Sequence, residues 1–583
     1  MKNKSWLSLS LSLSLSLSLC LMSVATHAQE SQVDVIVINA DIRTSNPAQP
    51  KAQAFAVNKG KFMAVGNNAF IKNMATQKTK IIDAKGKTVL PGLTDAHTHL
   101  LGGIELWQGV DLFGIKDRKQ WFKIIAKRDK ELAKGTWLVG GRWDVSDLDD
   151  PSMPTRQELD AIVPDRPVVL QDIDYHTVWL NTKAMQLLGI DKDTQAPQGG
   201  EIIKDSTTGE PTGIFKETAA NQLVLSHPLY TAAILSGNDA IPTLHQIVAH
   251  FNSLGITSVH DMWAELATVY TTLADSQKQL PMRIHFGLMV ADDQANLIQL
   301  QRYAKQRDEL NQRFIEREKQ WQNGPKFRFG YMKYFVDGTL MSYTAALNKP
   351  YSDRQHFNID PITSQIKLNE LVKNTNEVGF PVAIHAIGDK SVDIALNAIE
   401  STSKHLQMAN RIEHIEVISK VATSRFAELG VVASMQPDHA IAGNYQESRL
   451  GADRLPYSYA WKTLLSYGAS MVLGSDWPTA PENPMIQLSD VIFREYNGKT
   501  RYSDDALSLD EALYAYTQAP ANIAGWGNEI GSISVGKWAD FLILQDTLKL
   551  PLNKNIRDWK VIQTWFAGQK VFDRQLKLNN TEK

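Results

Sequence analysis

The chain has 583 residues, enough for two or three domains, although a single α/β barrel often exceeds the usual domain size. Hydrophobic residues make up 43% of it and charged residues 21%, and the formal net charge is −2. These values are typical of a globular protein. They exclude a largely disordered chain, and they give no indication of a nucleic-acid partner or a strongly charged substrate.

The first 28 residues have the composition of a secretory signal peptide. Lys2 and Lys4 precede a stretch of alternating leucine and serine, and the segment ends in small residues at Ala28. This pattern predicts cleavage near Ala28 and a periplasmic or secreted protein. The alternating serines leave too few apolar residues for a membrane span, which needs about 20. We therefore expect no stable membrane anchor after cleavage.

Cys20 is the only cysteine, and it lies inside the expected signal peptide. A lipid-attachment cysteine normally follows a small residue, whereas Leu19 precedes this one, so soluble export is favoured over a lipoprotein. The mature chain would then contain no cysteine, which excludes disulfides and thiolate metal sites. Any metal ion must be held by nitrogen and oxygen atoms.

Short runs rich in valine and isoleucine, typical of β-strands, occur at both ends of the mature chain. At the N-terminal end they fall within 29–90, and at the C-terminal end within 530–583. We therefore expect one small β-sandwich that is completed by both ends of the chain.

The middle of the chain, 91–529, alternates strand-like and helix-like segments. Repeated β–α units predict a parallel sheet, and eight units can close into a TIM-like (β/α)8 barrel. The eight expected strands are 89–96, 257–262, 283–290, 327–337, 381–386, 411–416, 431–436 and 471–476. The stretch of about 106–254 breaks this rhythm, so we interpret it as a large insertion. The charged segment 297–321 is expected to be a solvated outer helix.

The strongest motif is Asp95-Ala96-His97-Thr98-His99, which comes after Pro91-Gly92-Leu93 at the end of the first expected barrel strand. Residues two apart on a strand point the same way, so His97 and His99 can both face the barrel interior. Active sites of such barrels lie at the C-terminal ends of the strands. Two imidazoles that converge there are candidate metal ligands, and the alternative is a pair of polar histidines with other partners.

Four more residues strengthen the metal-site interpretation, because each lies at or near the C-terminal part of a different expected strand. These residues are Lys333, His385, His414 and Asp476. A chance coincidence explains such a constellation poorly.

Several motifs are more specific still, and they span nearly the whole mature chain. They are Pro91-Gly92-Leu93-Thr94-Asp95-Ala96-His97-Thr98-His99, Gly141-Arg142-Trp143-Asp144, Asp174-Tyr175-His176-Thr177, His385-Ala386-Ile387-Gly388-Asp389, Ile412-Glu413-His414, Gly474-Ser475-Asp476-Trp477-Pro478 and Gly536-Lys537-Trp538-Ala539-Asp540. With these motifs the chain resembles the amidohydrolase superfamily of metal-dependent hydrolases. Within it, the chain is most similar to the YtcJ-like branch, which includes N-substituted formamide deformylases.

The resemblance implies a role for each matching position. His97 and His99 would bind the more buried of one or two divalent ions together with Asp476. His385 and His414 would bind the second ion or, in a one-metal enzyme, one of them would bind or orient the substrate. Asp476 would also be catalytic, because it could move a proton from the attacking water to the leaving nitrogen. Zinc is the first choice for such ligands, although iron, manganese or nickel also suit them.

Lys333 matches the position where many two-metal members of the superfamily carry a carboxylated lysine that bridges both ions. A plain lysine is cationic and repels a metal, whereas its carbamate is an anionic oxygen ligand. The alternative is an ordinary lysine paired with a nearby acidic side chain, and the sequence leaves both open.

Four residues are candidates for substrate contact: Trp143, His176 and Trp179 in the insertion, and His439 after the seventh strand. In similar proteins the insertion covers the barrel mouth. The alternative for His176 is a structural histidine, and for the tryptophans it is packing inside the insertion. Glu217 is expected to be structural, and the alternative is that it reaches the site.

These observations predict an exported metal-dependent hydrolase that cleaves a carbon–nitrogen bond, other than a peptide bond, in a small molecule. An amide, a formamide or a cyclic amide fits this description. An ester, lactone or phosphoester could be cleaved by the same site, and a cyclising or deaminating activity shares the ligands. A non-catalytic exported binding protein is the remaining alternative, which a missing ligand would favour. The sequence leaves open whether the chain forms a homo-oligomer.

Overall fold

The computed structural model describes residues 33–574, apart from residues 147, 149, 198, 236–239, 263–266, 276–278, 291–294, 403–405, 442–444, 497–498, 502, 549–550 and 553. The expected signal peptide, 1–28, lies outside the described residues. Within the described part of the chain, no helix is long and apolar enough to cross a membrane.

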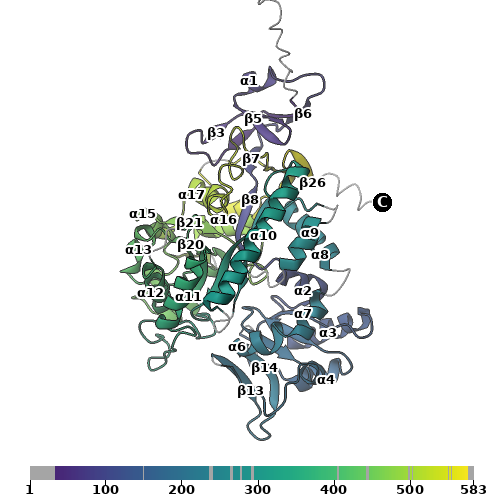
Figure 1. Cartoon of the computed structure of the whole chain (residues 1–583), viewed down its shortest axis with the longest axis vertical. Coiled ribbons are helices and arrows are strands. Elements are labelled where there is room, and N and C mark those ends of the chain that lie inside the picture. The colour runs from purple at the N-terminus through teal and green to yellow at the C-terminus, as the bar shows by residue number, and fades with distance from the viewer. Residues whose placement is uncertain are drawn as a thin grey trace, which may run out of the picture.

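Eight parallel strands form the centre of the molecule (Figure 1). In order around the sheet they are β8 (Leu93–Thr98), β15 (Ile256–Asp261), β16 (Arg283–Met289), β17 (Phe327–Phe335), β18 (Val382–Ala386), β19 (Arg411–His414), β20 (Val432–Met435) and β21 (Ser470–Leu473). The first and last strands meet at a parallel bridge between Thr98 and Trp477. The sheet is therefore almost closed, and the predicted (β/α)8 barrel is confirmed.

Helices surround this barrel because the outer face of its strands is apolar and needs cover from water. The main ones are α8 (Ala240–Ser253), α9 (Ala267–Asp275), α10 (Leu297–Trp321), α11 (Gln365–Glu377), α12 (Asp389–Glu400), α13 (Ala422–Glu428), α15 (Trp461–Ser466), α16 (Pro484–Phe493), α17 (Leu509–Ala515) and α18 (Gln518–Ile523). The long helix α10 buries only Leu300 and Phe314 completely, as expected for a solvated outer helix.

Two sheets at one end of the molecule combine strands from both ends of the chain (Figure 1). One contains β1 (Val35–Ile38), β4 (Ala54–Asn58), β5 (Lys61–Gly66) and β6 (Lys80–Asp83). The other contains β2 (Asp41–Arg43), β3 (Lys51–Ala52), β7 (Thr88–Pro91), β24 (Phe541–Leu544), β25 (Val561–Phe566) and β26 (Gln569–Asp573). Phe55 from the first sheet and Phe541 from the second pack edge to face in a shared core. The expected sandwich of both chain ends is therefore present.

The chain passes from the sandwich to the barrel at Gly92. The segment 89–96 was expected to be one strand, but β7 ends at Pro91 in the sandwich and β8 starts at Leu93 in the barrel. A Cβ atom on Gly92 would lie 2.2 Å from Thr257 Oγ1, so a larger residue would clash at this crossing. Close packing at the junction thus explains why one apolar run divides into two strands.

The insertion has its own sheet and lies at the opposite end from the sandwich (Figure 1). Its strands are β9 (Val110–Asp111), β10 (Gly140–Trp143), β11 (Val169–Asp172), β12 (Thr177–Leu180), β13 (Gly200–Lys204) and β14 (Pro211–Glu217). Its helices include α3 (Arg118–Glu131), α4 (Arg156–Ile162), α5 (Thr182–Leu187), α6 (Thr218–Ala220) and α7 (Pro228–Leu235). Helix α2 (Gly102–Gln108) connects the end of β8 to this part of the chain.

A buried ion pair joins the barrel to the sandwich, and its loss should destabilise the fold. Arg283 donates from Nε and Nη2 to the carboxylate of Asp540 at 2.7 and 3.0 Å, and the two side chains are 0% and 5% exposed. Asp540→Ala would leave the guanidinium buried and unpaired. We therefore expect a loss of about 3–5 kcal/mol in the free energy of unfolding, measured by denaturant titration.

The exposed pair Arg313–Asp275 provides a matched control, because its side chains are 49% and 35% exposed. Arg313→Ala should cost less than about 1 kcal/mol. Equal losses for the two variants would contradict the structural role of the Arg283–Asp540 pair.

Candidate metal centre and cavity

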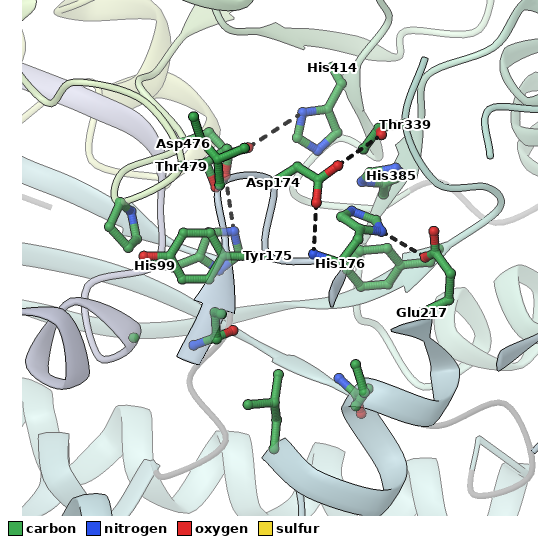
Figure 2. A pocket seen from close by; sticks show the side chains of 18 of the residues that line it. His99, Asp174, Tyr175, His176, Glu217, Thr339, His385, His414, Asp476 and Thr479 are labelled. Atoms are coloured by element: carbon green, nitrogen blue, oxygen red, sulfur yellow. Dashed lines mark hydrogen bonds and ion pairs between the residues drawn. The ribbon is translucent and has the colours of Figure 1, made fainter. Parts of the chain in front are cut away.

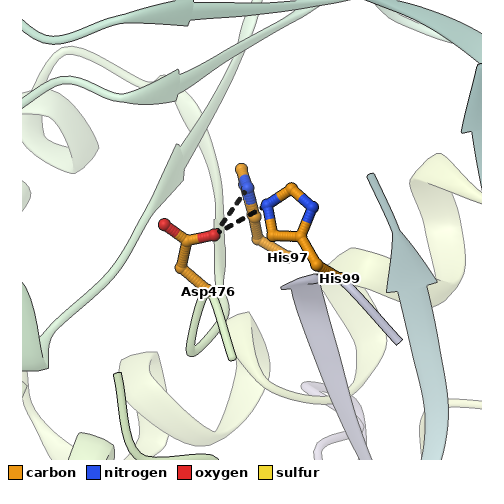
Figure 3. Close-up of side chains that lie close together, drawn as sticks. All are labelled: His97, His99 and Asp476. Atoms are coloured by element: carbon orange, nitrogen blue, oxygen red, sulfur yellow. Dashed lines mark ion pairs between the residues drawn. The ribbon is translucent and has the colours of Figure 1, made fainter. Parts of the chain in front are cut away.

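Three side chains converge where the barrel closes: His97 on β8, His99 directly after it, and Asp476 after β21 (Figure 3). Asp476 Oδ1 lies 3.2 Å from His97 Nε2 and 3.0 Å from His99 Nε2. The side chains of His97 and Asp476 are 0% and 9% exposed. The structure therefore brings these three residues together at the point where the barrel closes.

The atoms of this trio fit a divalent ion. His97 Nε2 and Asp476 Oδ1 are buried, and neither makes a hydrogen bond within the described part of the chain. A buried polar atom without a partner costs free energy, so a ligand that engages both atoms is favoured. Two imidazole nitrogens and one carboxylate oxygen are ligands that zinc and similar ions accept. The trio could therefore hold one such ion.

Glu413 on β19 orients the ring of His97 through a hydrogen bond. Its Oε2 accepts a hydrogen bond from His97 Nδ1 at 2.7 Å, and both side chains are 0% exposed. Arg411 donates to both oxygens of Glu413, at 2.5 and 3.0 Å. Burial opposes ionisation of Glu413, but Arg411 and His97 outweigh it and hold the pKa of this carboxyl well below its usual range. The charged carboxylate fixes the proton of His97 on Nδ1 and leaves Nε2 free for a metal.

A second trio shares Asp476. His414 ends β19 and His439 follows β20, and with Asp476 they form another cluster of potential ligand atoms. His414 Nδ1 and His439 Nε2 each lie 3.9 Å from Asp476 Oδ2. His439, expected at the substrate, therefore also lies among the candidate metal ligands.

His385 and Lys333, which were expected in the metal site, line the same cavity. The His385 ring lies 4.4 Å from that of His414, but its Nε2 lies 3.2 Å from the carbonyl oxygen of Gly338. Lys333 is 1% exposed, and burial lowers its pKa to about 8. Both residues are at the site, and among the histidines of the cavity His385 is outside the two candidate ligand trios.

The insertion contributes further side chains to the cavity wall (Figure 2). His176 pairs with Glu217 through Nδ1 and Oε2 at 2.7 Å, and its ring lies 5.7 Å from that of His385. Burial alone would lower the pKa of His176, but Glu217 and Asp174 outweigh this effect and raise it to about 10. His176 thus lines the cavity, and its contact with a substrate stays a prediction. Glu217 is part of the cavity rather than purely structural.

The cavity has a volume of about 1080 Å³ and extends from the barrel mouth into the insertion. Much of its wall is apolar, including Leu112, Ile115, Leu225, Met289, Met341 and Ile362. A cavity of this size can enclose a small organic molecule with a bulky apolar part.

Trp143 and Trp179, two of the expected substrate contacts, do not line this cavity. They are 2% and 0% exposed and lie in the hydrophobic core of the insertion. Each indole Nε1 donates to a main-chain carbonyl, that of Leu170 for Trp143 and that of Thr155 for Trp179. The structure therefore corrects the prediction: these tryptophans pack and stabilise the insertion.

Left-handed backbone conformations accompany the site. Asp476, His414, Tyr175 and Glu217 have φ values of +61°, +73°, +61° and +52°, which are unfavourable for residues with a side chain. All four line the cavity. Such conformations persist where the surrounding structure imposes them, and they are frequent at functional sites.

Sequence reasoning assigned no role to Arg411 or Glu413. Residues 411 and 413 share one side of β19, so a charged pair two residues apart on an expected buried strand was the available signal. The same alternation would turn His414 away from Glu413. The positive φ values of His414 and Ile415 break the alternation, which the sequence does not reveal.

Comparisons with known proteins agree with this geometry. The model of the amidohydrolase family matches residues 80–572. The YtcJ protein of Bacillus subtilis (strain 168) is 30% identical over 542 residues, covering 90% of this chain and 96% of that protein. The N-substituted formamide deformylase of Arthrobacter pascens is 28% identical over 551 residues, covering 93% of this chain and 98% of that enzyme.

Solved structures show the same fold. A metal-dependent hydrolase from Pyrococcus furiosus superposes with a TM-score of 0.67 at 26% identity, covering 88% of this chain and 100% of that chain. One from Pyrococcus horikoshii OT3 superposes with a TM-score of 0.70 at 24% identity, covering 89% of this chain and 99% of that chain. The family match and these relatives support a hydrolytic function that depends on a metal ion. The chain belongs to the amidohydrolase family.

Proposed function

We propose that this chain is an exported hydrolase that cleaves a carbon–nitrogen bond, other than a peptide bond, in a small molecule. The observation that carries the proposal is the trio of His97, His99 and Asp476, whose potential ligand atoms converge at a large and mostly apolar cavity. Export rests on the signal-like composition of residues 1–28.

The metal ion is a divalent one, with zinc as the first choice, bound by His97, His99 and Asp476. When bound there, such an ion lowers the pKa of water to about 7 and polarises a substrate carbonyl. Glu413 contributes by holding the His97 ring in place through the 2.7 Å hydrogen bond to Nδ1.

Asp476 moves the proton. Burial opposes its ionisation, but the rings of His97, His99 and His414 outweigh that effect and hold the pKa of its carboxyl well below the usual range. The carboxylate is therefore charged at neutral pH and can accept a proton from the attacking water. It then passes this proton to the leaving nitrogen, which must be protonated before it departs.

The substrate is an amide or formamide with a bulky apolar part. The apolar wall of the cavity favours such a group. The name of the Arthrobacter pascens relative, an N-substituted formamide deformylase, supports the same class of bond. His176, held by Glu217, faces the cavity beside His385 and contacts the substrate.

Lys333 is carboxylated in the active protein. A lysine reacts with carbon dioxide only as the neutral amine, and burial lowers its pKa to about 8. The neutral fraction near pH 7 is therefore far larger than for an exposed lysine, whose pKa is about 10.4. The resulting carbamate would offer anionic oxygen to the metal site.

This proposal for Lys333 predicts a pH-dependent carbamate. In protein equilibrated with ¹³C-bicarbonate, a carbamate signal should appear in the ¹³C NMR spectrum at pH 8. It should weaken as the pH falls below 7, because the amine becomes protonated. Lys333→Met removes the amine at similar side-chain length and should abolish the signal. A signal that persists in this variant would assign the carbamate elsewhere, and no signal in the wild type would leave Lys333 unmodified.

Three substrates with the same benzyl group test the proposed reaction. The purified chain supplied with zinc should release benzylamine from N-benzylformamide or N-benzylacetamide faster than it releases benzyl alcohol from benzyl acetate. Asp476→Asn should lower amine release at least about 100-fold, as expected for loss of a proton-transfer group. Chromatography of the products measures both results.

Asp129→Asn is the control, because Asp129 pairs with Arg166 in the insertion and does not line the cavity. This variant should keep the wild-type rate. Release of benzyl alcohol alone would replace the carbon–nitrogen assignment with an esterase. Wild-type turnover by Asp476→Asn would remove Asp476 from the reaction.

A further inference from the structure

The chain segment that carries Asp476 is held in place from two sides. On the barrel side, its main chain is hydrogen-bonded to that of His97 and His99 at the end of β8. The residues that follow Trp477 line the cavity together with Asp476 (Figure 2). Asp476 has a φ of +61°, and such a conformation persists where the surrounding structure imposes it. The position of its carboxylate therefore depends on the contacts of this segment.

The contact on the other side comes from the insertion. Arg142 on β10 donates from Nη1 to the carbonyl oxygen of Pro478 at 3.2 Å, two residues after Asp476. Its side chain is 11% exposed, and it is not among the residues that line the cavity. An effect of Arg142 on the reaction must therefore act through the segment that it holds.

Asp111 and Phe113 fix the orientation of the Arg142 guanidinium group. Asp111 accepts a hydrogen bond from Arg142 Nε at 3.0 Å and also pairs with Nη2. The guanidinium carbon lies 4.6 Å from the centre of the Phe113 ring, and the main-chain N–H of Phe113 donates to Asp111 at 3.0 Å. A bidentate pair of this kind has a defined geometry, so Nη1 is left for Pro478. Phe113 also lines the cavity, so Arg142 connects the apolar wall with the segment of Asp476.

The packing of the motif Gly141-Arg142-Trp143-Asp144 determines the direction of Arg142. A Cβ atom on Gly141 would lie 2.0 Å from the carbonyl oxygen of Gln171, so only glycine allows β10 to pair this closely with β11. Trp143 is buried in the core of the insertion, and Arg142 has a φ of +55°. The motif thus anchors β10 in the insertion and directs one charged side chain to the barrel.

We propose that Arg142 is a positioning residue for Asp476. By holding the carbonyl of Pro478, it keeps the carboxylate of Asp476 directed at His97 and His99, where the proposed metal ion binds. Proton transfer requires this placement, since a displacement of about 1 Å in an active site can lower a rate about 100-fold. The inference rests on the proposed function and deepens it, because it gives the insertion a part in the reaction besides covering the cavity.

Steady-state kinetics of Arg142→Met test the inference. This variant removes every donor of the guanidinium and keeps an unbranched side chain. With zinc-supplied protein and N-benzylformamide, kcat should fall about 10- to 100-fold while KM changes less than about twofold, because the substrate still binds but meets a displaced carboxylate. Arg142→Lys should recover part of the loss, since its ammonium group can donate to the same carbonyl.

Arg118→Met is the matched control. Arg118 also belongs to the insertion, its side chain is 17% exposed, and it pairs with Glu158 at 3.5 Å and with Ser152. These partners lie within the insertion, and Arg118 is not among the residues that line the cavity. This variant should keep the wild-type kcat, which separates positioning of Asp476 from a general effect on the stability of the insertion.

Zinc affinity provides a readout that does not depend on turnover. Asp476 is one of the three proposed ligands, so its displacement in Arg142→Met should weaken zinc binding about 10-fold, measured by competition with a chromophoric chelator. Arg118→Met should bind zinc as the wild type does. Circular dichroism checks that each variant is folded. If Arg142→Met is not, Asp111→Asn replaces it, because loss of the charge that holds the guanidinium should change both readouts in the same direction by a smaller factor.

Three results would overturn the inference: wild-type kcat and zinc affinity in the folded Arg142→Met variant, equal losses in Arg118→Met, or a raised KM with unchanged kcat. A wild type that binds zinc but does not hydrolyse N-benzylformamide would contradict the proposed function, and the zinc affinities of the two variants would then decide the inference alone. A wild type that binds no zinc would overturn both.

Discussion

The closure of the barrel between β8 and β21 is the constraint on which the site depends. Across this seam the main-chain N–H of Asp476 donates to the carbonyl of His97 at 2.7 Å, and that of His99 donates to the carbonyl of Trp477 at 2.8 Å. The candidate metal ligands at the two ends of a sheet that spans most of the chain are therefore brought together by the backbone itself. Their convergence is set by the backbone and does not depend on the conformations of flexible side chains.

The two motifs that meet at this seam, one around His97 and the other around Asp476, depend on each other for their packing and hydrogen bonds. A Cβ atom on Gly474 would lie 2.3 Å from the main-chain nitrogen of His97, so only glycine allows the strands to approach this closely. Asp95 accepts hydrogen bonds from the main-chain nitrogens of Ser475 and His97, at 2.9 and 3.2 Å. Asp95 thus holds the seam, whereas Asp476 faces the cavity.

Next to His97, the interior of the barrel contains buried charged side chains and is not apolar. Arg411 donates to Glu413, to the carbonyl of Ala96 at 2.7 Å and to Ser434 at 2.6 Å, and it therefore connects β19 with β8 and β20. Burying such charges costs free energy unless each of them has a partner. Removing one partner destabilises the fold by more than the intact pair stabilises it. This network indicates that the position of His97 is set by the interior of the fold and not by the metal alone.

The barrel strands and the cluster of side chains at their ends could be predicted because both depend on short-range patterns. Apolar runs of strand length mark the barrel, and His97, His99, His414 and Asp476 each lie at the end of one. The division at Gly92 could not be predicted, since it results from packing against Thr257, more than 160 residues away.

The candidate substrate contacts were harder to predict, because they too depend on contacts between residues far apart in the sequence. The alternation of β10 and β12 does not tell which face of the insertion meets the cavity, so Trp143 and Trp179 were placed on the wall, although they lie in the core. His176 directly precedes β12 and Glu217 ends β14, and these two strands are neighbours only in the folded sheet.

The most direct test of the account is the anomalous scattering of zinc in crystals of the metal-loaded protein. Data collected on both sides of the zinc absorption edge locate bound zinc without reference to activity. The account predicts a zinc peak within bonding distance of His97 Nε2, His99 Nε2 and Asp476 Oδ1. Full metal loading with no peak between these three residues would contradict it.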